Sequence, residues 1–228
     1  MGTMADEWNN PELAQEYSDK LDQVDWYEHD VNMPSWFSLI PEDTQRVLDF
    51  GSGPGQFTAK LSASYKTDGA DASAAMIEIA SKSFPDIDFM EWDGQSPFAG
   101  KHRYDTIFSK LTLHFVEDLD AFARFSRDAL TDDGCIVLSL IHPIRTVPKV
   151  DGKYAATENY DGTIGKYNLK VTMIHRSLEA YIKPFLDNDY VLTGILEPVI
   201  TQAQVTAHEL PEEDMYMPKR LNLRFQKA

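Results

Sequence analysis

Cysteine is nearly absent from this sequence: Cys135 is the one thiol among 228 residues, so no disulfide can form within the chain. A single cysteine suits a reducing compartment, and we expect a cytoplasmic protein. Long apolar runs are missing as well, because the longest, at 136–141, is far shorter than the about 20 residues of a membrane-spanning helix. The first residues, MGTMADEWNNPEL, lack the basic stretch and the apolar core of a signal peptide. We therefore expect neither a membrane span nor secretion.

Basic residues are scarce too. The 21 Lys and Arg residues face 37 Asp and Glu residues, which gives a formal net charge of −16. Such a chain repels polyanions unless its few basic residues gather in one patch. The most basic stretch, MPKRLNLRFQK, alternates with apolar residues and is typical of a strand. We therefore expect a neutral or cationic small molecule as partner and no nucleic acid.

Strand-like and helix-like segments alternate along the first 142 residues. Short apolar runs predict strands at 46–51, 66–71, 87–93, 104–110 and 135–141. Helical periodicity appears between them, at 56–65, from the capping Ser73 onward, and at 117–130. A later helix in SLEAYIKPFLDND should end at Pro184, and YVLTGILEPV and RLNLRF should form final strands. The alternation predicts an α/β fold with a doubly wound, Rossmann-like sheet.

The first predicted strand runs into a glycine-rich stretch, RVLDFGSGPGQFT, with glycines at positions 51, 53 and 55. Parallel strands of such a sheet end at one edge, where ligands bind. Glycine lets the backbone turn tightly and approach a ligand closely, because it has no Cβ. A tight strand-to-helix turn alone is the simpler explanation, but it does not need three alternating glycines. We therefore predict a ligand close to this backbone.

The residues around the glycines restrict the ligand's chemistry. A dinucleotide fingerprint, G-x-G-x-x-G, requires glycine where this sequence has Gln56, and no GK[ST] follows for a nucleoside triphosphate. Asp49, two residues before the first glycine, would repel a phosphate and attract a cation. We therefore expect a nucleoside with a cationic head.

Two further acids follow the next strands. Asp71 ends the second strand, where a carboxylate can accept hydrogen bonds from both ribose hydroxyls, although it could instead cap the following helix. Asp93 ends the third strand and could accept a hydrogen bond from an adenine amino group. Together with Asp49 they predict a nucleoside pocket.

These motifs resemble those of the class I S-adenosylmethionine-dependent methyltransferases, and specifically the small-molecule branch similar to the ubiquinone/menaquinone-biosynthesis type. VLDFGSGPGQFT resembles the glycine-rich first motif, GADASAAMIEIA the ribose motif, WDGQSPF the adenine motif and YDTIFSKLTLHFVEDLDAF the motif of the fourth strand. LTDDGCIVLSLIHP resembles the fifth-strand region, although TDDG replaces the usual Pro-Gly-Gly type of turn. The match covers roughly residues 45–145 in one order.

The resemblance implies a seven-stranded sheet, mostly parallel, that ends in an antiparallel C-terminal hairpin. It also implies one methyltransferase domain, with an N-terminal helical cap (1–44), a cofactor-binding half (45–142), a substrate lid (143–175) and a C-terminal helix and hairpin (176–228). Asp49 would lie near the methionyl amino group, Asp71 at the ribose and Asp93 at the adenine. The complete set of cofactor-binding residues that it implies is Tyr17, Asp49, Gly51, Ser52, Gly53, Asp71, Ala72, Met76, Asp93, Gly94, Ser109 and Lys110.

The implied reaction is methyl transfer from S-adenosyl-L-methionine to an O, N or C atom of a small molecule, which leaves S-adenosyl-L-homocysteine. Positioning dominates such a displacement, but an amine or hydroxyl acceptor must also lose a proton. His114 and His142 follow the fourth and fifth strands and are candidate bases, and His175 is a weaker candidate. A lone histidine is more often a polar packing residue, and that alternative stays open for each of them.

The segment 143–175 is too long for an ordinary strand-to-helix connection and carries Tyr154, Tyr160 and Tyr167, so we expect a lid or, alternatively, a surface hairpin. The histidines lack metal-ligand spacing, and no metal site is expected. Three other functions compete: an S-adenosylmethionine-binding protein without transfer activity, an NAD-dependent oxidoreductase and an RNA methyltransferase. The missing third glycine opposes the second and the net charge opposes the third. We expect a monomer or a homodimer.

Overall fold

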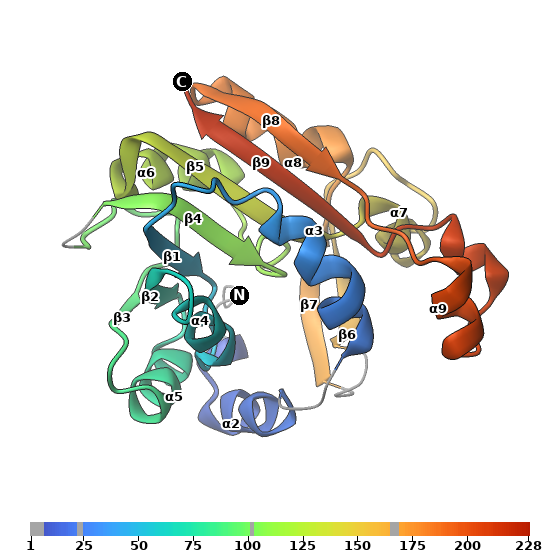
Figure 1. Ribbon diagram of the computed structural model, residues 1–228, viewed down its shortest axis with the longest axis horizontal. Helices are drawn as coiled ribbons and strands as arrows, with labels where there is room; N and C mark the ends of the chain where they lie inside the picture. The colour runs from blue at the N-terminus through green and yellow to red at the C-terminus, as the bar shows by residue number, and fades with distance from the viewer. Residues whose placement is uncertain (1–6, 22–24, 101–102, 165–168) are drawn as a thin grey trace.

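The computed structural model describes residues 7–21, 25–100, 103–164 and 169–228, and its centre is a seven-stranded sheet (Figure 1). The strand order is β3-β2-β1-β4-β5-β9-β8. The bounds are β1 Arg46–Phe50, β2 Lys66–Asp71, β3 Phe89–Glu91, β4 Tyr104–Lys110, β5 Leu130–Ile141, β8 Tyr190–Leu196 and β9 Arg220–Lys227. The first five strands pair in parallel, and β9 pairs antiparallel with both β5 and β8. The predicted doubly wound α/β fold with its antiparallel hairpin is confirmed.

Helices cover both faces of this sheet. The helices in the described ranges are α2 Pro11–Lys20, α3 Met33–Phe37, α4 Gln56–Leu61, α5 Ala74–Ser83, α6 Leu119–Ala129, α7 Pro143–Thr146, α8 Leu178–Asp187 and α9 Gln202–Ala207. Of these, α3, α4, α5, α6 and α8 pack on strands of the sheet. A π-helical turn, Glu28–Asn32, precedes α3, and 3₁₀ turns lie at Val147–Val150 and Glu212–Met215. None of the helices in the described ranges is long and apolar enough to cross a membrane.

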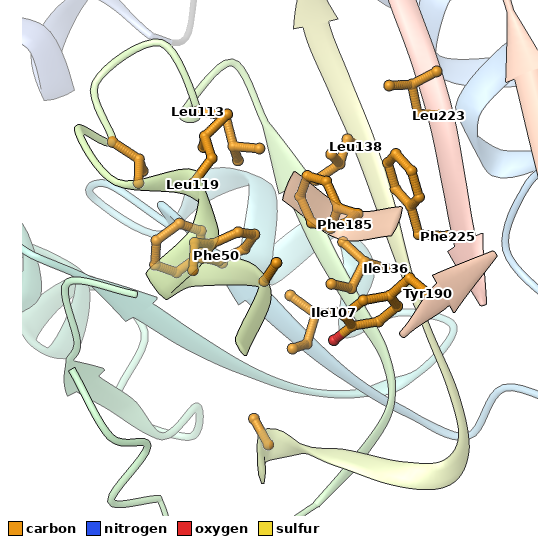
Figure 2. Close-up of a cluster of buried hydrophobic side chains, with 14 of the residues drawn as sticks. Phe50, Ile107, Leu113, Leu119, Ile136, Leu138, Phe185, Tyr190, Leu223 and Phe225 are labelled. Carbon is orange, nitrogen blue, oxygen red and sulfur yellow. The ribbon is translucent and has the colours of Figure 1, made fainter. Parts of the chain in front are cut away.

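Two apolar clusters hold the layers together. On one face, aromatic side chains of α8 and β9 stack, with the Phe185 and Phe225 rings 4.3 Å apart, above aliphatic residues of β4 and β5 (Figure 2). On the other face, the fully buried Trp36 of α3 packs on Phe108 of β4, with ring centroids 4.4 Å apart. Because large apolar side chains are removed from water on both faces, the sheet is a rigid platform for the loops at its carboxyl edge.

The strand order reverses between β2-β1 and β4-β5, at β1. Register places Asp49 of β1 opposite Phe108 of β4, and Phe50 opposite Ala70 of β2. The carboxyl ends of these three strands therefore lie together, and the crevice above such a reversal is where doubly wound sheets bind ligands.

Several local predictions differ from the structure, among them the helix predicted at 56–65, which ends at Leu61. The helix at 178–187 continues through Pro184, because burial of Phe185 and a hydrogen bond from the Asn188 side chain to the Pro184 carbonyl support its last turn. The stretch TDDG belongs to β5, which begins at Leu130 and not at the predicted residue 135. The pairing of β5 with β4 is irregular between Leu130 and Cys135. The third strand is shorter than predicted, and α9 was not predicted.

The segment 143–175 folds beyond the main sheet. After α7 and a 3₁₀ turn, β6 (Glu158–Ile164) and β7 (Leu169–His175) pair antiparallel as a separate two-stranded sheet. Tyr160 lies buried within this hairpin, whereas Tyr154 is exposed. Tyr167 lies outside the described residues.

Candidate cofactor and acceptor site

A cavity of about 720 Å³ opens at the carboxyl ends of β1, β2 and β4. Helix α2, the turn at Glu28–Asn32 and the β6–β7 hairpin complete its walls. Of the residues predicted from sequence, it is lined by Tyr17, Asp49, Gly51, Ser52, Gly53, Asp71, Ala72, Met76, Asp93, Lys110 and His114. The structure therefore brings together residues that are spread over almost 100 positions of the chain.

The three glycines have different roles. Gly51 adopts φ +78, and a Cβ there would lie 2.1 Å from the Thr112 hydroxyl, so packing alone requires glycine. Gly55 is equally constrained, because its Cβ would approach Phe89 to 2.9 Å. Gly53, at φ +52, has only Tyr17 nearby, at 3.9 Å. The backbone at Gly53 thus faces open cavity, where a ligand could contact it directly.

Asp71 holds this loop in place. Its carboxylate accepts hydrogen bonds from the backbone N–H groups of Gly53 and Ser73, both at 2.9 Å. Burial raises the pKa of Asp71, and these N–H donors oppose the rise. The predicted alternative is partly correct, because Asp71 does support the start of α5, but Ser73 is the residue that caps that helix, accepting from the N–H of Met76.

Asp49 is 2% exposed at the base of the cavity. The Thr58 hydroxyl donates to one of its oxygens at 2.7 Å. Burial raises the pKa of Asp49 to about 7, although Thr58 and the positive charge of Lys110 oppose this. A buried carboxylate that lacks a hydrogen-bonded cation is suited to bind one.

Asp93 and its neighbour differ in their relation to the cavity. One Asp93 oxygen accepts from the N–H groups of Gln95 and Ser96 and from the Ser96 hydroxyl, while the residue still lines the cavity. Gly94 is not among the lining residues, and a Cβ there would lie 2.6 Å from Phe50. Ser109 is fully buried and is not among the lining residues either, and its hydroxyl has no hydrogen-bond partner in the part of the chain that the structure describes.

His114 is 4% exposed and lines the cavity beside Phe115. Burial lowers its pKa to about 3, with the charges of Arg220 and Arg176 contributing, and its Nδ1 has no hydrogen-bond partner within the described ranges. The loop that carries it is held by the buried Arg176, which donates to the carbonyls of Leu113, Val116 and Glu117 at 2.9, 2.6 and 3.0 Å. Desolvation disfavours the protonated imidazole, so His114 stays neutral where an exposed histidine would begin to protonate.

His142 is not among the residues that line this cavity. Its ring pairs with Glu197 at 2.6 Å and accepts from the N–H of Ile144, which caps α7. His175 is also not among the lining residues. It is fully buried and contacts the Thr146 hydroxyl and the Tyr154 carbonyl.

Sequence reasoning missed the part of the site that distant segments supply. The N-terminal strap, residues 7–9, spans the cavity: Ser73 donates to the Trp8 carbonyl at 2.7 Å, and Thr172 of the hairpin donates to Glu7 at 2.9 and 3.1 Å. The Trp8 ring packs edge-on against Tyr17 and Phe115. Glu28 and Arg220, 192 positions apart, pair in the cavity wall at 2.5 Å. No local pattern reveals contacts between segments so far apart.

Comparisons with known proteins agree with this architecture. Residues 47–134 match the family model of a methyltransferase domain. An S-adenosylmethionine-dependent methyltransferase from Mesorhizobium loti is 25% identical, with a TM-score of 0.66 over 85% of this chain and 96% of that one. A putative S-adenosylmethionine-dependent methyltransferase from Listeria monocytogenes is 19% identical, with a TM-score of 0.70 over 86% and 96%. DhpI, in a complex with SAM and HEP, is 18% identical, with a TM-score of 0.65 over 98% and 96%. No curated protein matches the sequence.

Residues 47–134 thus match a methyltransferase domain, and the fold of the chain is similar to that of S-adenosylmethionine-dependent methyltransferases. S-adenosylmethionine, the cofactor of these similar proteins, fits the cavity on three observations: open space at Gly53, a buried Asp49 with no hydrogen-bonded cation among the described residues, and a buried Ser52 hydroxyl with no hydrogen-bond partner among them. The resemblance to the ubiquinone/menaquinone branch stays a prediction. Within the described residues, no group of three or more His, Cys, Asp or Glu side chains could hold a metal ion.

Proposed function

We propose that this protein binds S-adenosylmethionine above β1 and β2 and transfers its methyl group to a small molecule held under the β6–β7 hairpin. One observation carries the proposal: a single cavity joins the buried Asp49, the open backbone at Gly53 and the strand-end Asp71. These groups offer, in order along the sheet edge, a partner for a cation, close backbone contact and acceptors for hydroxyl groups.

Each cofactor contact follows from this order. Asp71 keeps acceptor capacity beyond its two backbone donors and would receive the ribose hydroxyls. Asp93 uses one oxygen for Gln95 and Ser96, so its second oxygen would receive the adenine amino group. The buried Met76 would pack against the adenine ring. Gly94 and Ser109 would act behind these residues, by shaping the loop and the strand end.

The acceptor half of the cavity has mostly apolar walls. Trp8, Phe115, Ile141, Ile164 and Met173 line it from the strap, the loop after β4, the end of β5 and the hairpin. These walls exclude water, which favours an acceptor with an apolar body. The hairpin therefore serves as the substrate lid, since two of these side chains come from its strands.

When bound, the cofactor supplies a methyl group already activated by its sulfonium. The protein's part is to hold the acceptor in line with it and to exclude water. A neutral His114 can accept a hydrogen bond from the acceptor, which orients the nucleophile. With a pKa of about 3 its imidazole is too weak a base to remove a proton from an amine or an alcohol at neutral pH. In this proposal His114 acts by orientation, and His142, which is not among the cavity-lining residues, has no part in the reaction.

Titration calorimetry with S-adenosylhomocysteine and with NAD tests the proposal. We expect saturable binding of S-adenosylhomocysteine and none of NAD. Asp71→Ala should weaken binding about 10- to 100-fold, the equivalent of losing a hydrogen bond to a charged group. Binding of NAD at micromolar concentrations, with no response to S-adenosylhomocysteine, would overturn the assignment. Unfolding measured on the same Asp71→Ala sample separates lost affinity from lost structure.

A further inference from the structure

Arg220 lines the acceptor half of the cavity and belongs to neither the predicted cofactor-binding residues nor the candidate bases. It begins β9 and pairs with Ile141, the last residue of β5. Ile141 is one of the apolar wall residues, and partners across an antiparallel pair lie on the same face of the sheet. The Arg220 side chain therefore starts beside the walls that enclose the acceptor.

Three neighbouring residues hold the Arg220 guanidinium in one orientation. Glu28 Oε1 accepts from Nε at 2.8 Å and lies 2.5 Å from Nη2. The Lys219 carbonyl accepts from Nη1 at 3.2 Å, and the centre of the Tyr27 ring lies 5.7 Å from the guanidinium carbon. Because the side chain is already fixed, binding a ligand costs little additional side-chain entropy.

Glu28 is fixed in turn by the interior of the protein. Its Oε2 accepts from Nδ2 of Asn32 at 2.8 Å, and the fully buried Asn32 accepts from Nδ2 of Asn222 at 3.0 Å. This chain of hydrogen bonds leads from the cavity wall into the core. Glu28 therefore serves to orient Arg220.

The oriented guanidinium keeps donors for a ligand. A guanidinium carries five N–H groups, and at most three of those on Arg220 are directed at Glu28 or at the Lys219 carbonyl. The others, on Nη1 and Nη2, have no acceptor among the described residues, and the side chain is 18% exposed. Donors in this arrangement suit the oxygens of a carboxylate or a phosphonate.

A second cation adds to the positive charge at this end of the cavity. Within the described ranges, the 4% exposed Arg176 is bound by backbone carbonyls and not by a carboxylate. The charges of Arg220 and Arg176 both lower the pKa of His114, as a positive potential at that point would. The acids Asp49, Asp71 and Asp93 line the cofactor half instead.

The local charge is thus opposite in sign to the net charge of −16. A site can attract an anion even when the chain as a whole is acidic, because nearby charges dominate inside a partly desolvated cavity. The structure therefore favours a different acceptor from the neutral or cationic molecule that the composition predicts.

We propose that Arg220 binds an oxyanion group of the methyl acceptor, so that the acceptor is an acid with an apolar body. This inference rests on the proposed function and names the substrate class of the same site. The acidic group lies at Arg220, while the separate nucleophile is oriented by His114. Carboxylates and phosphonates share the required chemistry.

Titration calorimetry on the protein saturated with S-adenosylhomocysteine tests this inference. The probes share one aromatic ring and one hydroxyl group and differ at the other end: p-hydroxyphenylacetate, p-hydroxybenzylphosphonate, p-hydroxyphenylethanol and p-hydroxyphenylethylamine. At least one acid should bind about 10- to 100-fold more tightly than the alcohol, as expected for a hydrogen bond between charged groups, and the amine should bind most weakly. The two acids distinguish a planar from a tetrahedral oxyanion.

Variants then assign the preference to one residue. Arg220→Met should weaken the preferred acid about 10- to 100-fold and change the alcohol less than about 3-fold. Because this change leaves Glu28 unpaired, the double variant Arg220→Met/Glu28→Gln should be measured beside it, with the same result expected. Arg220→Lys keeps the charge and should retain part of the preference.

Arg224→Met is the control, because it removes the same charge from β9 outside the cavity lining. It should keep the full preference for the acid. Equal losses for acid and alcohol in both Arg220 variants that carry Met would show that Arg220 only supports the wall, and the inference would be wrong. Acids that bind no better than the alcohol, or not at all, would also overturn it. Failure to bind S-adenosylhomocysteine would instead contradict the proposed function itself.

Discussion

The contribution of Asp49 to the stability of the folded chain depends on pH. Its pKa of about 7 in the folded chain exceeds the ordinary value of 3.8 because the side chain is buried. Between these two pH values the folded state holds a proton that the unfolded state releases, so its contribution to stability is complete below about pH 4 and is lost as pH rises through 7. The difference between 3.8 and about 7 corresponds to on the order of 4 kcal/mol.

Asp49→Asn should therefore stabilise the ligand-free protein at pH 8 by up to about 4 kcal/mol relative to the unaltered chain, and by much less at pH 5. Urea unfolding at the two pH values measures the difference. Asp88→Asn, at an exposed position, should change stability by less than about 0.5 kcal/mol at either pH. An Asp49→Asn variant that is less stable at pH 8 would show that the ionised carboxylate is well compensated in the fold.

His114 gives a second prediction for a single residue. Its imidazole should stay neutral from pH 8 down to about pH 4, because burial and two nearby arginines lower its pKa to about 3. Two-dimensional NMR of the ring resonances, assigned by their absence in His114→Gln, would follow its titration. A midpoint between pH 6 and 7 would contradict the desolvated environment and would make His114 a candidate base again.

At the scale of elements, the N-terminal strap connects the cofactor half of the cavity to the hairpin. Glu7 accepts two hydrogen bonds from Thr172, and Asn9 accepts one from the N–H of Ala74. If this strap closes over the bound cofactor, Glu7→Ala should speed the dissociation of S-adenosylhomocysteine about 3- to 10-fold, since it removes a charged acceptor. Stopped-flow displacement measures the rate.

Gln15→Ala is the matched control for this prediction, because it alters an exposed residue of α2 outside the cavity lining. Its dissociation rate should equal that of the unaltered protein. Equal rates for Glu7→Ala and the control would mean that the strap does not restrain the cofactor.

Sequence alone was sufficient for elements whose pattern is local. The strands β1, β2 and β4 follow their apolar runs and turn signals within one residue. It was insufficient where distant packing decides, as in α8, where the stacking of Phe185 on Phe225 keeps a helix intact beyond Pro184. The third strand was overestimated because its apolar residues continue past the short ladder with β2.

Some residues of the candidate site could likewise be predicted from local sequence, and others could not. Asp49, Asp71 and the glycines could be located from sequence because strand ends meet at one edge of a parallel sheet. The partners Glu28 and Arg220 could not, since their pairing depends on how the N-terminal segment folds over β9. The pKa of His114 could not either, because desolvation by the whole fold sets it. Local sequence therefore identifies these residues of the site, whereas tertiary contacts determine their partners and their pKa values.

For the whole molecule, the net charge of −16 predicts a dependence of stability on salt. Like charges repel in the compact state, and about 0.1 M salt screens them over about 10 Å. Raising NaCl from 10 to 200 mM at pH 8 should therefore stabilise the protein by about 1 kcal/mol, or raise Tm by about 2–4 °C for a chain of this length. Calorimetric scans would show this rise in Tm.

The same increase in NaCl at pH 5 should have less effect on stability, because carboxylates begin to protonate at that pH. A Tm that falls with salt would mean that attractive pairs such as Arg46–Asp68, at 2.6 Å and largely buried, outweigh the overall repulsion.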